Sequence, residues 1–277
     1  MDTIIQILAR ELGRSEAHVE NVVRLIDEGN TIPFIARYRK ELHGAMDDTA
    51  LRTLADRLQY LRNLDKRREE VKSAIEGQGK LTEELSAAID AAATLAEVED
   101  LYRPYKQKRR TRATVAREKG LEPLAELLFA QAADGPAPEE AAGAFIDPEK
   151  GVATAEDALQ GASDIIAERI SDDADIRKRL RELVWKKGYL VSAAAAKEPE
   201  DTVYRLYYAF RSPLNRVQGH QVLAINRGER EGVLKVSVEM EREAALIPVR
   251  RAVLNPGAPA MAFVRAAAED AYDRLIF

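Results

Sequence analysis

Residues 98–120 read VEDLYRPYKQKRRTRATVAREKG, a stretch in which a proline-bent turn and a run of cations coincide. Its first residues continue a helical pattern that Pro104 interrupts between two tyrosines. Proline fixes its own φ angle and moves the preceding residue away from helical geometry. A second short helix then runs to Gly120, a residue type that commonly ends helices. The stretch therefore predicts a stiff turn between helical segments.

The same stretch concentrates positive charge. Residues 101–120, here called the basic turn, hold eight bases and one acid, a net charge of +7 in a chain of net charge −5. Residues 131–175, the acidic stretch, hold twelve acids and two bases. Repulsion of this size has to be offset by acids elsewhere in the fold or by a polyanion. We expect the acidic stretch to lie within reach of the basic turn and to neutralise part of it. A solvated basic loop is the alternative.

Composition narrows the class of protein. A chain of 277 residues that is 46% hydrophobic and 32% charged can bury a sizeable core and form more than one unit. The absence of cysteine excludes disulfide frameworks and thiolate zinc sites. No apolar run approaches the roughly 20 residues of a membrane span, and the N-terminus lacks a signal-peptide pattern. We expect a mainly α, cytoplasmic protein with no membrane partner.

Three short helices are predicted at residues 3–12, 16–28 and 31–40. Two helices joined by a short turn, with cations on the second, form the arrangement that a helix-turn-helix DNA reader needs. Here the cations are Arg37, Arg39 and Lys40. The alternative is an ordinary helical pair in which the arginine stems cover apolar surface.

A long helix is predicted at about residues 48–76, beginning at Asp47 and Asp48. Its apolar stripe consists of Leu51, Leu54, Leu58, Leu61, Leu64 and Val71. Charged residues of both signs surround this stripe, which is typical of a packing helix with a solvated outer face. Two further helices, at residues 81–92 and 95–102, lead into the basic turn.

Helices are also expected beyond the turn, at residues 121–131, 138–145, 154–171 and 173–196. Trp185 in the last of these is expected to anchor a core or a helix interface. Residues 221–225 and 233–238 alternate and are rich in β-branched side chains, with turn residues between them. This pattern predicts a small β-hairpin near residues 221–238. A helix over residues 258–277 reaches the last residue without a cap, which suggests that a longer protein continues from it.

The expected organisation has three parts. Residues 1–75 hold the helix-turn-helix-like start and the long connecting helix. Residues 76–215 form a central helical domain with the basic turn. Residues 216–277 contribute the β-hairpin and a C-terminal helix.

The sequence shows no arrangement of residues that is typical of a catalytic site. His18, His43 and His220 lie in separate patterns, and none has a second metal ligand at helical or hairpin spacing. The chain lacks the short motifs of serine hydrolases, zinc proteases and dinucleotide-binding enzymes. Paired carboxylates such as Asp172 and Asp173 stand at helix starts, where capping explains them. We therefore expect no enzyme activity, no metal and no cofactor.

Three distinctive stretches resemble one known family. They are NTIPFIARYRK at residues 30–40, LAEVEDLYRPYKQKRRTRA at residues 95–113 followed by GLEPLA at 120–125, and VLAINRGEREGVL at residues 222–234. Together they resemble the bacterial transcription accessory proteins of the Tex family, within the S1-domain RNA-binding superfamily. The resemblance covers essentially the whole chain. It implies the N-terminal fragment of a longer protein, lacking the RNase H-like domain, helix-hairpin-helix units and S1 domain that follow in the family.

The resemblance also implies a function in nucleic-acid binding linked to transcription, without an established catalytic site. This fragment would be a helical scaffold with weak, non-specific phosphate contacts to RNA or DNA. The candidate contact residues are Arg37, Arg39, Lys40, Arg103, Lys106, Lys108, Arg109, Arg110 and Arg112.

A protein-interaction platform is the alternative. It would dock RNA polymerase, by analogy with a related eukaryotic elongation factor, or the later domains of the same protein. This part of the chain would then make no nucleic-acid contact. Neither hypothesis includes a small-molecule substrate.

Overall fold

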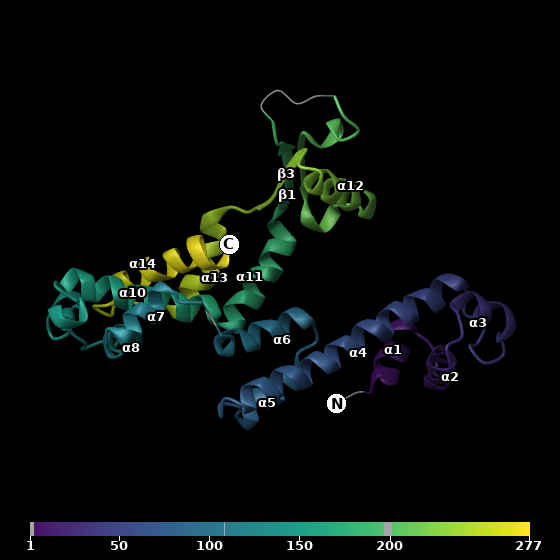
Figure 1. Cartoon of the computed structure of the whole chain (residues 1–277), viewed down its shortest axis with the longest axis horizontal. Coiled ribbons are helices and arrows are strands. Elements are labelled where there is room, and N and C mark those ends of the chain that lie inside the picture. Colours follow the sequence, from purple (N-terminus) through teal and green to yellow (C-terminus); the bar gives the residue numbers. More distant parts are fainter. Residues whose placement is uncertain (1–2, 108, 197–200) are drawn as a thin grey trace. The chain divides into compact units, whose positions relative to one another are not determined.

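The computed structural model describes residues 3–107, 109–196 and 201–277 (Figure 1). The chain forms two compact units, Met1–Tyr105 and Lys106–Phe277. Each unit has its own hydrophobic core. Helices make up most of both units, so the predicted mainly α class is confirmed. The expected three-part division, with boundaries near residues 75 and 215, stays a prediction.

The first unit is built on one long helix, α4 (Asp48–Glu76). Its apolar side chains recur every three or four residues and are buried, as the sequence predicts. The shorter helices of the unit are α1 (Ile4–Leu12), α2 (Glu16–Asp27), α3 (Ile32–Tyr38), α5 (Glu83–Ala91) and α6 (Leu95–Tyr102). All five pack against α4, and a 3-10 turn, η1 (Arg103–Tyr105), ends the unit.

Ion pairs set the register of the helices that cover α4. Four cations of α4 each reach a different helix. The pairs are Arg57 with Glu11 of α1 (2.7 Å), Arg62 with Asp27 of α2 (2.7 Å), Arg67 with Glu99 of α6 (2.6 Å) and Lys72 with Asp90 of α5 (2.9 Å). Each ion pair connects α4 to a different neighbouring helix, so the charged side chains of α4 help to specify where those helices lie. The apolar stripe of α4 contributes most of the buried hydrophobic surface.

The second unit is centred on α10 (Ala155–Asp172), which is buried along much of its length. The elements packed against it are α7 (Arg112–Glu118), α8 (Glu122–Ala130), α9 (Pro138–Gly143), α14 (Met261–Asp270) and the π-helical turn η5 (Ala271–Ile276). Gly161 of α10 lets Leu121 approach closely, since a Cβ atom at this position would overlap the leucine side chain. The close packing of α10 therefore depends on a residue without a side chain.

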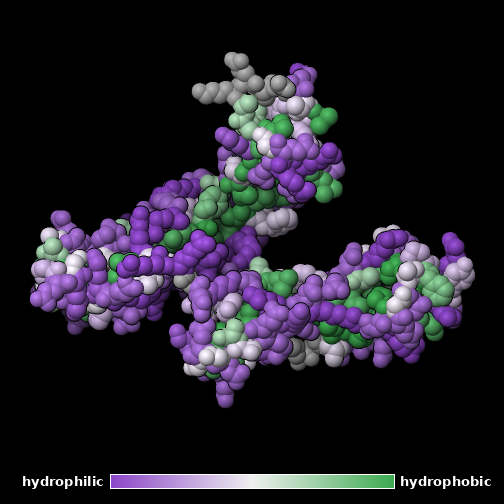
Figure 2. All heavy atoms as spheres, in the orientation of Figure 1, coloured by the Kyte–Doolittle hydropathy of each residue, from purple (hydrophilic) through white to green (hydrophobic). Residues whose placement is uncertain are grey.

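A three-stranded antiparallel sheet completes the second unit, in the order β2–β1–β3. Helix α11 (Ala174–Lys187) leads into the central strand β1 (Tyr189–Ala194), and the outer strands are β2 (Ala209–Pro213) and β3 (Leu234–Glu239). Helix α12 (Gly219–Arg230) packs against β3, and helix α13 (Arg242–Val253) follows that strand. The remaining 3-10 turns are η2 (Pro148–Lys150), η3 (Arg205–Tyr207) and η4 (Leu214–Arg216). Figure 2 shows hydrophobic residues gathered where β3 runs into α13.

Two predictions about this region are wrong. The hairpin near residues 221–238 does not form, because residues 221–225 belong to α12 and β3 pairs with β1 instead. Ile225 and Gly228 are the buried residues of α12, and their spacing is helical. The predicted helix 173–196 also stops early, because α11 ends at Lys187 and residues 189–194 form the central strand.

Trp185 lies at the surface of α11 and not in a core. Its predicted role as a core anchor is wrong, since 60% of the residue is exposed. Helix α11 buries Ile176 and Leu180. Trp185 lies five residues after Leu180 and therefore about 140° further round the helix, away from this stripe.

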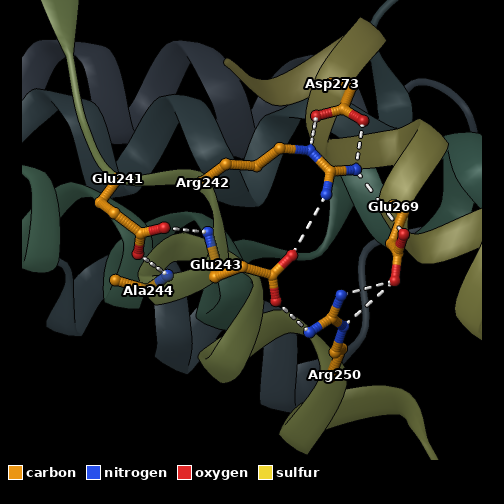
Figure 3. A network of polar contacts seen from close by, with 7 residues as sticks. All are labelled: Glu241, Arg242, Glu243, Ala244, Arg250, Glu269 and Asp273. Atoms are coloured by element: carbon orange, nitrogen blue, oxygen red, sulfur yellow. Dashed lines mark hydrogen bonds and ion pairs between the residues drawn. The ribbon is translucent and has the colours of Figure 1, made fainter.

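A network of charged side chains joins α13 to α14 and η5 (Figure 3). Arg242 contacts Asp273 through two hydrogen bonds of 2.9 and 2.6 Å. Arg250 bonds Glu269 at 2.6 Å and Glu243 at 2.8 Å. The hydrogen bonds from Arg242 hold the pKa of Asp273 below its ordinary value. This network fixes α13 against the helices that follow it.

The Arg242–Asp273 contact predicts a dependence of stability on pH. Because the folded-state pKa of Asp273 lies below 3.8, its carboxylate contributes fully above that pH and stops contributing as pH falls through the lower folded pKa. At neutral pH, Asp273→Asn should therefore lower the midpoint of thermal unfolding by up to about 3 °C. The difference between the variant and the parent should shrink in acid and vanish well below pH 3.8. A difference that persists at the lowest pH would contradict this role for the carboxylate.

Candidate nucleic-acid interface

The end of α3 presents cations and aromatic rings together. This surface, here called the α3 patch, consists of Phe34, Arg37, Tyr38, Arg39 and Lys40. The two rings lie 5.2 Å apart between centroids, and they are 37% and 57% exposed. The Arg37 guanidinium lies 5.9 Å from the Tyr38 ring, and that of Arg39 lies 5.9 Å from the Phe34 ring. Cations bind phosphates and exposed rings stack on bases, so the patch has both groups that bind single-stranded nucleic acid.

The cations of the α3 patch are exposed as the sequence predicts. Among the residues that the structure describes, none of the three forms an ion pair. The position of the patch follows from the short helix that carries it, because Pro33 occupies the first turn and Ile35 is the residue that α3 buries. Phe34, Arg37 and Tyr38 are the exposed patch residues on α3 itself, and Arg39 and Lys40 follow directly after its last residue.

Residues of α2 contact the loop that follows α3 and hold it in place. Asn21 of α2 donates a hydrogen bond to the Leu42 carbonyl at 3.2 Å. His43 is buried, and neither of its ring nitrogens has a hydrogen-bond partner. Gly44 has a positive φ of 58°, and the His18 ring lies so close that a Cβ atom would overlap it. The chain that follows Lys40 is thus anchored to α2.

The basic turn is divided between the two units, because the boundary falls after Tyr105. Arg103 is half-buried in η1, Lys106 is exposed, and each has an interaction partner. Lys108 lies outside the described residues. The side chain of Gln78 donates a hydrogen bond of 2.9 Å to the Tyr105 carbonyl, which pins the proline-bent corner to the end of α4.

Part of the basic turn is neutralised internally. Arg117 bonds Glu168 of α10 at 2.7 Å, and the same carboxylate accepts a hydrogen bond of 3.0 Å from Thr111. Lys119 donates a hydrogen bond of 2.8 Å to the Gly151 carbonyl. Residues of the acidic stretch therefore do reach the basic turn, as expected.

The other predicted residues of the turn behave differently from one another. Arg110 pairs with Glu118 at 2.8 Å, and both side chains are more than half exposed. Arg109 and Arg112 are exposed, and in the described part of the chain neither has an ion pair. Within the described residues of the turn, these two arginines are the cations that have positive charge left for an outside partner.

Sequence reasoning missed the aromatic half of the α3 patch. Phe34 and Tyr38 stand four residues apart on a helix, a spacing that places two side chains side by side. That spacing beside Arg37 and Arg39 is the signal that would have identified the patch before the structure.

Residues 3–107, 109–196 and 201–277 contain neither a cluster of metal ligands nor a helix that could span a membrane. No group of three or more histidine, aspartate or glutamate side chains in these ranges could hold a metal ion. Within the same ranges, no helix has the length and apolar character needed to cross a membrane.

Comparison with protein families shows to which family the chain belongs. The description "Tex-like protein N-terminal domain" matches residues 2–76, which end with α4. The description "Tex central region-like" matches residues 134–272, half of the chain. The chain belongs to the Tex family. The basic turn lies between the two matched Tex regions.

The sequences of individual relatives support the same family assignment for this chain. It is 45% identical over 274 residues to YdcI of Bacillus subtilis, a match that covers 98% of the chain and 38% of the relative. It is 41% identical to "Transcriptional accessory protein Tex" of Neisseria gonorrhoeae, covering 86% of the chain and 31% of the relative. It is 32% identical to human "S1 RNA-binding domain-containing protein 1", covering 86% of the chain and 24% of the relative. The chain therefore spans less than two fifths of each of these relatives.

The two ion pairs of the basic turn should differ in their value for stability. Arg117→Ala removes a hydrogen bond from Glu168, which is largely buried, so the free energy of unfolding should fall by about 1–3 kcal/mol. Arg110→Ala removes an exposed pair and should cost at most about 0.5 kcal/mol. Urea unfolding of both variants measures the difference. Equal losses would show that the Arg117–Glu168 contact does not hold α7 to α10.

Proposed function

We propose that this chain is the helical scaffold of a nucleic-acid-binding transcription accessory protein and adds non-specific phosphate contacts of its own. Membership in the Tex family supports the general role. So do the names of two relatives, one a transcriptional accessory protein and the other an S1 RNA-binding domain protein. The ligand is RNA or DNA, bound weakly by this part of the protein.

The α3 patch is the observation that carries the proposal. Its three cations are exposed, and no described carboxylate pairs with them. Neutralising phosphates with such cations releases counterions, which favours binding at low salt. Phe34 and Tyr38 add surfaces on which bases of any sequence stack. The patch therefore binds the backbone and the faces of bases without reading their edges.

The basic turn supplies a second set of contacts. Arg109 and Arg112 are its main phosphate ligands, because both are exposed and no described acid pairs with them. Arg110, Arg103 and Lys106 contribute less, because each already has a partner inside the protein. Lys108 belongs to the same proposed set by its place in the sequence.

The helix-turn-helix hypothesis is kept in a restricted form. Helices α2 and α3 are joined by a turn of four residues, as such a motif requires. Recognition helices contact bases with their N-terminal residues, whereas the α3 patch lies toward the C-terminal end of α3. We therefore propose phosphate contact rather than base reading, with either RNA or DNA.

Several further parts of the proposal concern the whole protein. It acts in the cytoplasm, without catalytic activity, and takes neither a membrane nor a small molecule as partner. RNA polymerase is its proposed protein partner. These statements rest on the family's link to transcription and on the residues present in this sequence.

A protein-interaction platform is the second candidate. The internal contacts of Arg110, Arg117 and Lys119 favour it, because cations used inside the fold support structure rather than phosphate binding. In this version the basic turn positions a docking surface for RNA polymerase or for later domains of the same protein.

A double substitution in the α3 patch separates the two candidates. Arg37→Ala with Arg39→Ala should weaken binding of mixed-sequence single-stranded RNA about tenfold at low salt, because two phosphate contacts are lost. The free energy of unfolding should change by less than about 0.5 kcal/mol, since neither arginine has a described ion pair. Fluorescence anisotropy and urea unfolding measure the two quantities.

Arg14→Ala with Lys80→Ala is the matched control. Both residues are exposed, lie in the same unit and have no described ion pair. Each double variant removes two positive charges, so the net charge of the chain changes equally. The control should retain RNA affinity to within about twofold. Equal weakening by the two double variants would reduce the effect to overall charge and would remove the α3 patch from the proposal.

A further inference from the structure

Helices α11 and α13 pack together in the second unit and leave a groove between them. The groove has a volume of about 380 Å³. Its apolar lining comes from Leu183 of α11 and from Ala244, Ile247 and Pro248 of α13. Ile247 is 53% exposed, so an apolar side chain is available at the surface of the groove.

The groove is also strongly positive. Four cations line it, and the single acid among the lining residues is Glu182. The cations are Arg179, Lys186 and Lys187 of α11 and Arg251 of α13. Among the described residues, none of the four forms an ion pair. The neighbouring acids Glu243, Glu269 and Asp273 are engaged by Arg242 and Arg250 (Figure 3).

Pro248 lies inside α13 and changes its backbone hydrogen bonding beside the groove. Proline has no backbone N–H, so the Ala244 carbonyl lacks the donor that the residue four positions on gives in an α-helix. Ala244 and Pro248 both line the groove. The groove therefore combines apolar surface with unpaired positive charge, and the network around Arg242 and Arg250 holds α13 in position.

We propose that the α11–α13 groove binds an acidic polypeptide segment that inserts an aliphatic side chain between the two helices. Glutamate and aspartate side chains of the segment pair with the four cations, while its aliphatic side chain covers Leu183 and Ile247. An aliphatic anchor fits because the lining contains no aromatic ring on which a base could stack. In this respect the groove differs from the α3 patch, whose rings are exposed.

This binding site is separate from the proposed nucleic-acid contacts. The groove shares no residue with the α3 patch or with the basic turn. A failure of either proposal therefore leaves the other standing, and each has its own variants.

The test uses the full chain and a fluorescein-labelled peptide rich in glutamate with leucine at every fourth position. Fluorescence anisotropy at low ionic strength measures its affinity. Arg179→Glu with Arg251→Glu reverses one charge on each helix and should weaken binding by at least about tenfold. Ile247→Ser should weaken binding about threefold or more without changing charge. A peptide with serine in place of leucine should bind more weakly than the parent peptide.

Arg230→Glu with Arg265→Glu is the matched control, because both arginines are exposed, lie in the same unit and have no described ion pair. This control should leave peptide affinity within about twofold of the parent value. Equal weakening by the two charge-reversal variants would overturn the proposal, as would equal binding of the leucine and serine peptides. Displacement of the peptide by a single-stranded oligonucleotide, with oligonucleotide binding lost in the Arg179→Glu, Arg251→Glu variant, would assign the groove to nucleic acid instead.

Discussion

Pairing of charges between helices is the constraint on which the arrangement of this chain depends. The chain has 42 basic and 47 acidic residues, and its helices can pack only where opposite charges meet or face water. Four cations of α4 each reach a different helix, Arg117 reaches α10, and Arg242 and Arg250 join α13 to the C-terminal helices. Exposed pairs add little stability individually. The larger consequence of these ion pairs is that, among the described residues, they leave a limited set of other cations without a carboxylate partner.

The unpaired cations mark the surfaces available to partners. On the α3 patch they lie beside two exposed rings, which favours nucleic acid. In the α11–α13 groove they surround aliphatic side chains, which favours an acidic peptide. In the basic turn, Arg109 and Arg112 stay unpaired within the described residues, while Arg117 holds α7 to α10. The same residue type therefore stabilises the fold where a carboxylate lies within reach, and is available for the proposed binding where none does.

Sequence reasoning predicted the elements that carry long periodic patterns. Helix α4 repeats its apolar spacing over about six turns, so its stripe from Leu51 to Val71 could be assigned in advance. Residues 221–225 are too few for alternation to be distinguished from helical spacing, and the hairpin prediction failed there. Strand β1 becomes a strand through pairing with residues up to 50 positions away, which no local pattern contains.

The candidate sites were predictable to a similar extent. The clustering of cations near Arg37 and Arg109 is visible in the sequence, and both arginines are exposed in the structure. Which cation finds a carboxylate is not visible, since Glu168 lies 51 residues from Arg117. The α11–α13 groove was also beyond prediction, because Arg179 and Arg251 are far apart in the sequence and line one groove only in the folded chain.

The most direct measurement of the central claim is the salt dependence of RNA binding by the full chain. A chain of net charge −5 binds a polyanion only where unpaired cations are held together at the surface. Plotting log Kobs for mixed-sequence single-stranded RNA against log salt concentration should give a slope of about −2 or steeper, because the α3 patch alone supplies three cations at about −0.7 each. A flat plot, or no binding at low salt, would contradict the claim that these cations are available to phosphate.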